Sequence, residues 1–206
     1  IEVGLVEHIA AGLACGGREV ELPYLQVVMG GLYHQALEAT SSNKGDAPGQ
    51  PILTQAAYHE QGELDGILAR FLEEKVSSLS DANTGRQILK TLVTRDGERQ
   101  VLERSTLASE AEQFGGPIMP ESLEGLLHEL EIARILRTIS CGHLLQLGHT
   151  VLSRTVHTWL TGVDKEVLEV RETFRSRFRE YQVRNKARAA LLDAGFFAFL
   201  APYESR

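Results

Sequence analysis

The sequence has little cysteine and no long apolar run. Cys15 and Cys141 are the only cysteines among 206 residues, and neither lies in a C-x-x-C pair or beside histidines at the spacing of zinc ligands. The longest strongly apolar stretch, residues 196–201, is far shorter than the roughly 20 residues that a membrane span needs. We therefore expect reduced thiols, no membrane span and a cytoplasmic location.

Motifs for catalysis and metal binding are also missing. The sequence contains no phosphate-binding loop of the form G-x-x-x-x-G-K-[ST], no G-x-S-x-G elbow, no H-E-x-x-H helix and no calcium loop. His143, His149 and His157 lie near one another in the chain, but no cysteine or carboxylate cluster completes a metal site beside them. The sequence thus predicts no catalytic residues, no metal site and a chain that is not an enzyme by itself.

Acidic residues exceed basic ones, but unevenly along the chain. The net charge is -7, and residues 1–150 carry 11 basic and 21 acidic side chains, against 10 basic and 7 acidic ones in residues 151–206. An acidic body repels a phosphate backbone, so specific nucleic-acid binding is not expected. The first residue is Ile1 rather than methionine and no leader peptide is visible, which indicates a piece taken from a longer protein.

Most of the remaining sequence has the apolar period of helices. Residues 22–39 place apolar side chains on one face, with Pro23 in the first turn, where a missing N–H costs little. Ser80 is the expected N-cap of another helix, and the turn-forming stretch 40–51 predicts an exposed loop. Further helical patterns cover residues 53–58, 64–79, 81–93, 105–111 and 121–136.

The last third of the sequence predicts a hairpin and then a long helix. Two short apolar runs, 135–139 and 144–147, flank a Ser-Cys-Gly-His turn, and three helices followed by such a hairpin have the order of a winged-helix domain. Apolar side chains then recur at intervals of three and four from Val163 to Tyr181, with Glu and Arg on the other faces. We predict a mainly α fold with one short β-hairpin, divided into a helical subdomain at 1–79, a winged-helix domain at 80–160, and a connector helix with a C-terminal segment at 161–206.

Three segments carry a likeness to a known family. They are ELPYLQVVMGGLY at 21–33, LTQAAYHEQGELDGIL at 53–68, and LGHTVL at 147–152 followed by Trp159. In this order they resemble L-P-[LY]-L-Q…L-[WY], L-T…Y…L-G-G-V-x-G-A-L and [VL]-A-H-E-A-L-L…W of the region after the nucleotide-binding core in bacterial STAND-type NTPases, signalling relatives of NB-ARC and NACHT proteins. The run Gln61-Gly62-Glu63 departs from the second motif, and Thr150 stands where an acidic residue is usual.

The resemblance implies a function and two binding residues. The first subdomain would be a lid whose Pro23 packs against adenine, and the winged helix would close over ADP with His149 reaching the β-phosphate. ADP or ATP would be held together with the nucleotide-binding core of the same longer chain, and not tightly by this chain alone. The implied role is a regulatory switch that holds the ADP-bound resting state and opens for homo-oligomerisation, as in signalling and bacterial defence.

Two other functions remain open on the residues alone. A winged-helix transcription regulator needs Arg, Lys, Asn or Gln on its third helix to meet base edges and phosphates. That helix instead carries four glutamates against two arginines near its end: Glu121, Glu124, Glu129, Glu131, Arg134 and Arg137. A helical oligomerisation scaffold could use the apolar stripe at 163–181, and the size of the chain in solution distinguishes this function.

Overall fold

The computed structural model describes residues 1–14, 20–42, 50–140, 142–184, 195 and 201, and the chain is mainly α-helical with a small antiparallel sheet. The predicted fold class is therefore confirmed. Cys15, Cys141 and most of the predicted loop at 40–51 lie outside these residues. The elements in chain order are α1 (Leu5–Leu13), α2 (Leu22–Ser42), α3 (Gln55–Glu60), α4 (Glu63–Ser77), α5 (Ala82–Thr91), β1 (Leu102–Glu103), α6 (Leu107–Ala111), a 3-10 turn (Glu112–Phe114), α7 (Pro120–Ile132), β2 (Leu136–Ile139), β3 (Leu144–Leu147), α8 (Thr150–Thr158) and α9 (Gly162–Val183).

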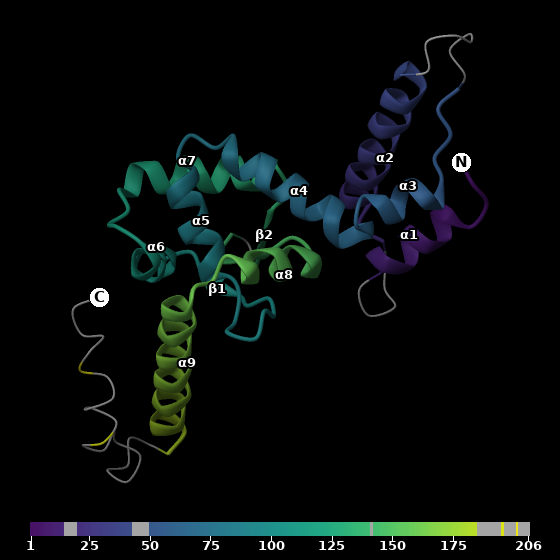
Figure 1. Ribbon diagram of the computed structural model, residues 1–206. Helices are drawn as coiled ribbons and strands as arrows, with labels where there is room; N and C mark the ends of the chain where they lie inside the picture. The colour runs from purple at the N-terminus through teal and green to yellow at the C-terminus, as the bar shows by residue number, and fades with distance from the viewer. Residues whose placement is uncertain (15–19, 43–49, 141, 185–194, 196–200, 202–206) are drawn as a thin grey trace.

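Helices α1 to α3 form one group, and α4 connects it to the rest of the molecule. Helix α2 buries a face whose residues recur every fourth position, Tyr24, Val28, Leu32 and Ala36, as its apolar period predicts. Helix α4 packs against α1, α2 and α3 and also against α5 and α8. Figure 1 shows α4 extending from the α1–α3 group to the group that holds α5, α6, α7 and the sheet.

The second group consists of three helices and three strands. The strands lie in the order β1-β3-β2, with Leu136 opposite Leu147 and Leu102 opposite Leu145. The predicted hairpin is confirmed as β2 and β3. Strand β1 was not predicted, because two residues paired with a strand more than 40 positions away leave no alternating pattern in the sequence.

Several helix ends differ from the prediction: α2 continues to Ser42, into the start of the predicted loop, and two other ends have identifiable causes. The N-cap of α5 is Asp81, whose carboxylate accepts the N–H groups of Asn83 and Thr84 at 3.0 Å, while Ser80 donates its hydroxyl to Glu129. Helix α7 ends at Ile132 rather than at 136. Arg134 takes a left-handed conformation (φ 61°) there, and the next N–H donates back to the carbonyl of Leu130, so the chain turns directly into β2.

Helices α1 and α8 were not predicted. Helix α8 lies against α4, and Trp159 at its end joins the two helices. The indole Nε1 donates to the Glu73 carboxylate at 2.7 Å, and the Arg86 guanidinium lies 5.5 Å from the centre of the ring. Both contacts tie α8 to the α4–α5 region, so α8 belongs to the core as well as to the chain between the sheet and α9.

Helix α9 confirms the long C-terminal helix. It begins at a capping box in which Thr161 accepts the Asp164 N–H and Asp164 accepts the Thr161 N–H, at 3.1 and 2.8 Å. Its apolar stripe is buried at Val167 but exposed further along, at Phe174 and Phe178. None of the helices in the described ranges is long and apolar enough to cross a membrane.

Candidate functional site

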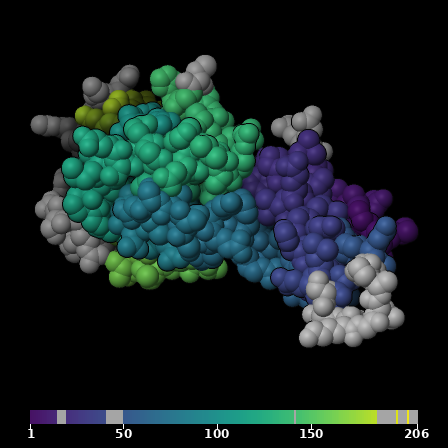
Figure 2. Space-filling model, turned by 90° about the horizontal axis from the view of Figure 1, so that it is seen from above, coloured from purple at the N-terminus to yellow at the C-terminus, as the bar shows by residue number. Residues whose placement is uncertain are grey.

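The start of α2 meets the end of the sheet at a closely packed seam. Tyr24 is 2% exposed, and its hydroxyl donates to the backbone carbonyl of Arg134 at 2.5 Å. Burial, together with the nearby Glu21 carboxylate, raises the pKa of the Tyr24 phenol, so the hydroxyl stays protonated and remains a donor. Figure 2 shows the surface of α2 in contact with that of the β2–β3 region at this seam. One tyrosine therefore fixes where α2 lies relative to the hairpin.

Gly148 makes this close approach possible. It follows β3, and its N–H donates to the carbonyl of Ile135 at 2.8 Å. A β-carbon at this position would lie 2.1 Å from the Tyr24 hydroxyl oxygen and 2.6 Å from the Arg134 carbonyl oxygen. No side chain fits there, so the glycine is required by space rather than by backbone conformation.

His149 is the N-cap of α8 and is 1% exposed. Its Nδ1 accepts the N–H of Val151 at 3.1 Å, and its Nε2 lies 3.3 Å from the carbonyl oxygen of Leu13 at the end of α1. The ring also lies against Tyr24, with 5.0 Å between ring centres. A histidine whose Nδ1 accepts a hydrogen bond carries its proton on Nε2 when it is neutral, so the Nε2–H donates to Leu13.

Burial also sets the charge of this histidine. Removal from water lowers the pKa of His149 below its ordinary value, although the bond to the Leu13 carbonyl and the Glu21 carboxylate act in the opposite direction. The neutral form is therefore the form that the fold favours. His149 thus joins α1, α2 and α8 as an uncharged hydrogen-bond donor.

The lowered pKa of His149 predicts a pH dependence of stability. The unfolded chain binds the proton with a pKa of about 6.5 and the folded chain with a lower pKa, so the unfolded state binds more protons between these values. The stabilisation is fully present above about pH 6.5 and is lost as the pH falls below it. We expect the free energy of unfolding to fall from pH 7.5 to pH 5 more steeply in the wild type than in His149→Asn, as measured by urea titration.

The comparison isolates this one residue, because the other six histidines are common to both chains. Asparagine also keeps an N-cap acceptor for α8. Equal slopes in the two proteins would show that the pKa of His149 is the same in the folded and unfolded states.

Pro23 lies on the exposed rim of the same seam. It lines a cavity of about 480 Å³ together with Tyr24, Arg134, Arg137 and Gly148, and Arg137 there forms an ion pair with Glu21 at 3.4 Å. A second cavity of about 570 Å³ on the other side of Pro23 is lined by Phe71 and Ile132 among others. Tyr24 thus lies against the His149 ring and also lines the cavity that Pro23 lines.

The remaining histidines of the α8 region do not converge with His149. His157, at the other end of α8, lies with its Nε2 2.9 Å from the carbonyl of Arg95. Within the described part of the chain, no group of three or more His, Cys, Asp or Glu residues is placed to hold a metal ion.

The sequence matches the family described as Novel STAND NTPase 1 over residues 1–189. The chain belongs to this family. The resemblance carried by the three motifs is thus confirmed, and the assignment supports a STAND-type signalling module in general. Neither the curated proteins nor the solved structures include a match.

In this STAND family member, the site contains residues that sequence reasoning did not select. Tyr24 and Gly148 stand next to Pro23 and His149 in the two motifs, but no pattern in the sequence shows that their atoms approach each other. The Leu13 carbonyl was also missed, because α1 was not predicted. The one local signal was Gly148 itself, directly before a histidine that caps a helix.

Proposed function

We propose that the chain is the nucleotide-state switch of a STAND-type NTPase. In this role it holds the ADP-bound resting state of a longer protein and opens for homo-oligomerisation, without catalysing hydrolysis by itself. Its direct partner is the nucleotide-binding core of the same protein, in the cytoplasm. The family assignment supports the general class, and the seam around Tyr24 and His149 supports the specific role.

The order of the elements supports a winged-helix interpretation of the second group. It runs α5-β1-α6-α7-β2-β3, with a three-stranded sheet closed by a hairpin, as in winged-helix variants of the helix-turn-helix class. We propose a lid at 1–79, a winged-helix domain at 80–160 and a connector at 161–206. In this division His149 lies at the end of the winged helix and Pro23 on the lid.

The observation that carries the proposal is the set of contacts made by His149. Its Nε2–H is a donor of the kind that a phosphate oxygen accepts, and it lies beside the residues that join the lid to the hairpin. The donor is engaged with the Leu13 carbonyl, so contact with a phosphate requires that bond to open. Pro23 offers an exposed apolar ring that suits an adenine face. The residues therefore offer a phosphate donor and an apolar ring for adenine once the bond between His149 and α1 opens.

The test is His149→Asn in the longer protein that carries a phosphate-binding core. Asparagine keeps the N-cap of α8 but is too short to replace the Nε2–H. A hydrogen bond to a charged phosphate contributes roughly 1.5–3 kcal/mol, so we expect ADP to dissociate about tenfold faster or more, with raised basal oligomerisation. Release of a fluorescent ADP analogue, followed by stopped flow, measures the rate.

A matched control is His157→Asn, which changes the same residue type on the same helix, far from the seam. It should leave ADP release unchanged. Wild-type ADP release from a natively folded His149→Asn protein would remove His149 from the mechanism.

The structure gives the DNA-binding alternative little support. The Arg104 guanidinium, which lies beside α7, is engaged by Glu124 at 2.5 Å and by Glu131 at 3.6 Å. Base recognition needs free donors on the third helix, and α7 presents carboxylates there instead. The scaffold alternative rests on the exposed part of α9, where Phe174 and Phe178 face the solvent.

A further inference from the structure

Helix α9 is attached to the second group through both apolar and charged side chains. Among its residues, the apolar Val167 and Leu168 are buried, together with the ionisable Asp164 and Arg171. Further along, Phe174 is 44% exposed and Val183 is 78% exposed. The helix therefore has a docked half near its start and a half that projects from the molecule (Figure 1).

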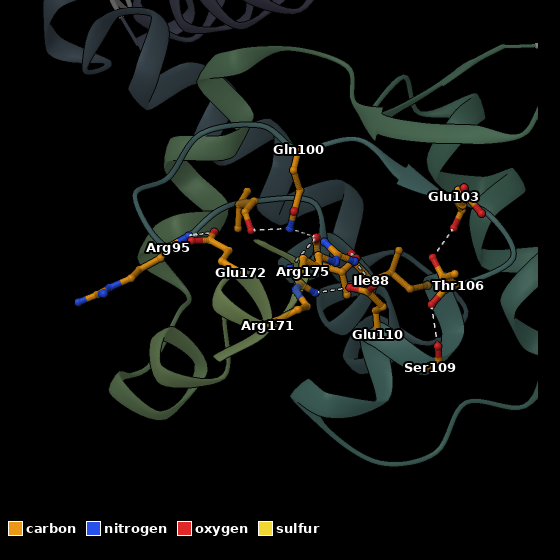
Figure 3. Close-up of polar contacts among 12 residues, drawn as sticks. Ile88, Arg95, Gln100, Glu103, Thr106, Ser109, Glu110, Arg171, Glu172 and Arg175 are labelled. Carbon is orange, nitrogen blue, oxygen red and sulfur yellow. Dashed lines mark hydrogen bonds and ion pairs between the residues drawn. The ribbon is translucent and has the colours of Figure 1, made fainter. Parts of the chain in front are cut away.

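The centre of the docked half is one carboxylate that binds two arginines. Glu110 of α6 accepts from Arg171 with one oxygen, at 2.5 Å, and from Arg175 with the other. The side chains of Glu110 and Arg171 are 13% and 8% exposed, against 36% for Arg175. Figure 3 shows the two arginines converging on Glu110 between α9 and α6. We call Glu110, Arg171 and Arg175 the clasp.

Arg171 depends on Glu110 for its counter-ion. Its Nη2 lies 3.5 Å from the carbonyl of Thr91, and its Nε has no hydrogen-bond partner among the described residues. Burial lowers the pKa of Arg171, because the charged guanidinium has lost most of its contact with water. A buried charge that loses its partner is strongly destabilised, whereas a pair replaced by apolar side chains is not.

The other ion pairs of α9 differ from the clasp in place or in burial. Lys90 binds Asp164 at 2.8 Å, but this pair lies in the first turn of the helix. Arg95 binds Glu169 at 2.8 Å, and both side chains are about half exposed to solvent. Exposed ion pairs contribute little to stability, so the clasp is the buried ion-pair contact of α9 beyond its first turn, next to the apolar contacts of Val167 and Leu168.

We propose that the clasp gives α9 a docked and a released state, with the Glu110 carboxylate as the group that holds it docked. In the docked state the projecting aromatic half of α9, where Phe174 and Phe178 are stacked, moves as one body with the second group. In the released state it moves independently. The inference goes beyond the proposed nucleotide switch, and its test needs no nucleotide.

The test is hydrogen exchange, read by mass spectrometry, on the full 206-residue chain at neutral pH. In Glu110→Gln, amides of the segment 165–175 should exchange about tenfold faster or more, because Arg171 then favours an open position in water. Peptides from α7 and from β2–β3 should keep their wild-type exchange. The matched control is Glu124→Gln, which breaks the more exposed pair with Arg104 and should leave α9 unchanged.

A second variant separates the clasp from a general weakening of α6. In Glu110→Gln/Arg171→Met both buried charges of the clasp are gone, so exchange in 165–175 should return to within about threefold of the wild type. Three results would each overturn the proposal. They are wild-type protection of α9 in Glu110→Gln, faster exchange across the whole chain in that variant, and no recovery in the double variant.

Discussion

Gly148→Ala is expected to lower the free energy of unfolding by about 2–3 kcal/mol. The new methyl group would overlap the Tyr24 hydroxyl and the Arg134 carbonyl, and neither can move away freely. Tyr24 is buried in the core face of α2, and Arg134 sits in the turn that joins α7 to β2. Urea unfolding followed by circular dichroism measures the change.

Gly125→Ala is the matched control. Gly125 lies within α7, and a β-carbon there would meet nothing within 4 Å. Alanine is the better helix former, so this variant should be more stable than the wild type by about 0.5–1 kcal/mol. A Gly148→Ala chain as stable as the wild type would mean that the seam between α2 and the hairpin is loose in solution.

Asp164→Ala is expected to cost about 2–3 kcal/mol, because it removes two contributions at once. The capping box at the start of α9 contributes roughly 1 kcal/mol. The side chains of Lys90 and Asp164 are only 15% and 12% exposed. In Asp164→Ala the mostly buried ammonium of Lys90 would therefore lose its counter-ion. Asp164→Asn keeps an oxygen for the cap, and we expect it to lose about half as much.

The same residue predicts a change in acid stability. Burial alone would raise the pKa of Asp164, but the Lys90 ammonium and the bonds from Thr161 together lower it. The folded pKa therefore lies below the unfolded value of about 3.9, and the stabilisation is present above that value and lost as the pH falls through the folded pKa. Unfolding free energies of the wild type and Asp164→Asn should converge at the lowest pH that is accessible.

Asp65→Asn provides the surface comparison. Its partner Arg154 lies 3.0 Å away, but both side chains are more than half exposed. Such pairs contribute about 0–1 kcal/mol, so this variant should be near the wild type. A similar loss in Asp65→Asn and Asp164→Asn would contradict the importance of burial at the start of α9.

Helix α9 could be predicted from the sequence because its apolar side chains recur among charged ones over 22 residues. The capping pattern Thr161-x-x-Asp164 also marks the start of this helix in the sequence. By contrast, the end of α7 depends on Arg134 adopting a conformation that glycine usually takes, and no sequence pattern gives that end.

The candidate site was predicted in part. The motifs selected Pro23 and His149, and the structure places both at the seam between α2 and the hairpin. The contacts of the seam join Tyr24 to the Arg134 carbonyl and His149 to the Leu13 carbonyl, and the two partners of each contact are distant in the chain. Contacts between distant segments leave no period or spacing in the sequence, so only the packed structure shows them.

Trp159 gives the protein a built-in optical reporter. It is the single tryptophan of the chain, and its indole is held by Glu73 of α4 with the Arg86 guanidinium over the ring. The emission of an indole responds to neighbouring charges and to water, so separation of α8 from α4 changes the fluorescence without any attached dye. Movements of α8 relative to α4 can thus be timed in the unlabelled wild-type chain.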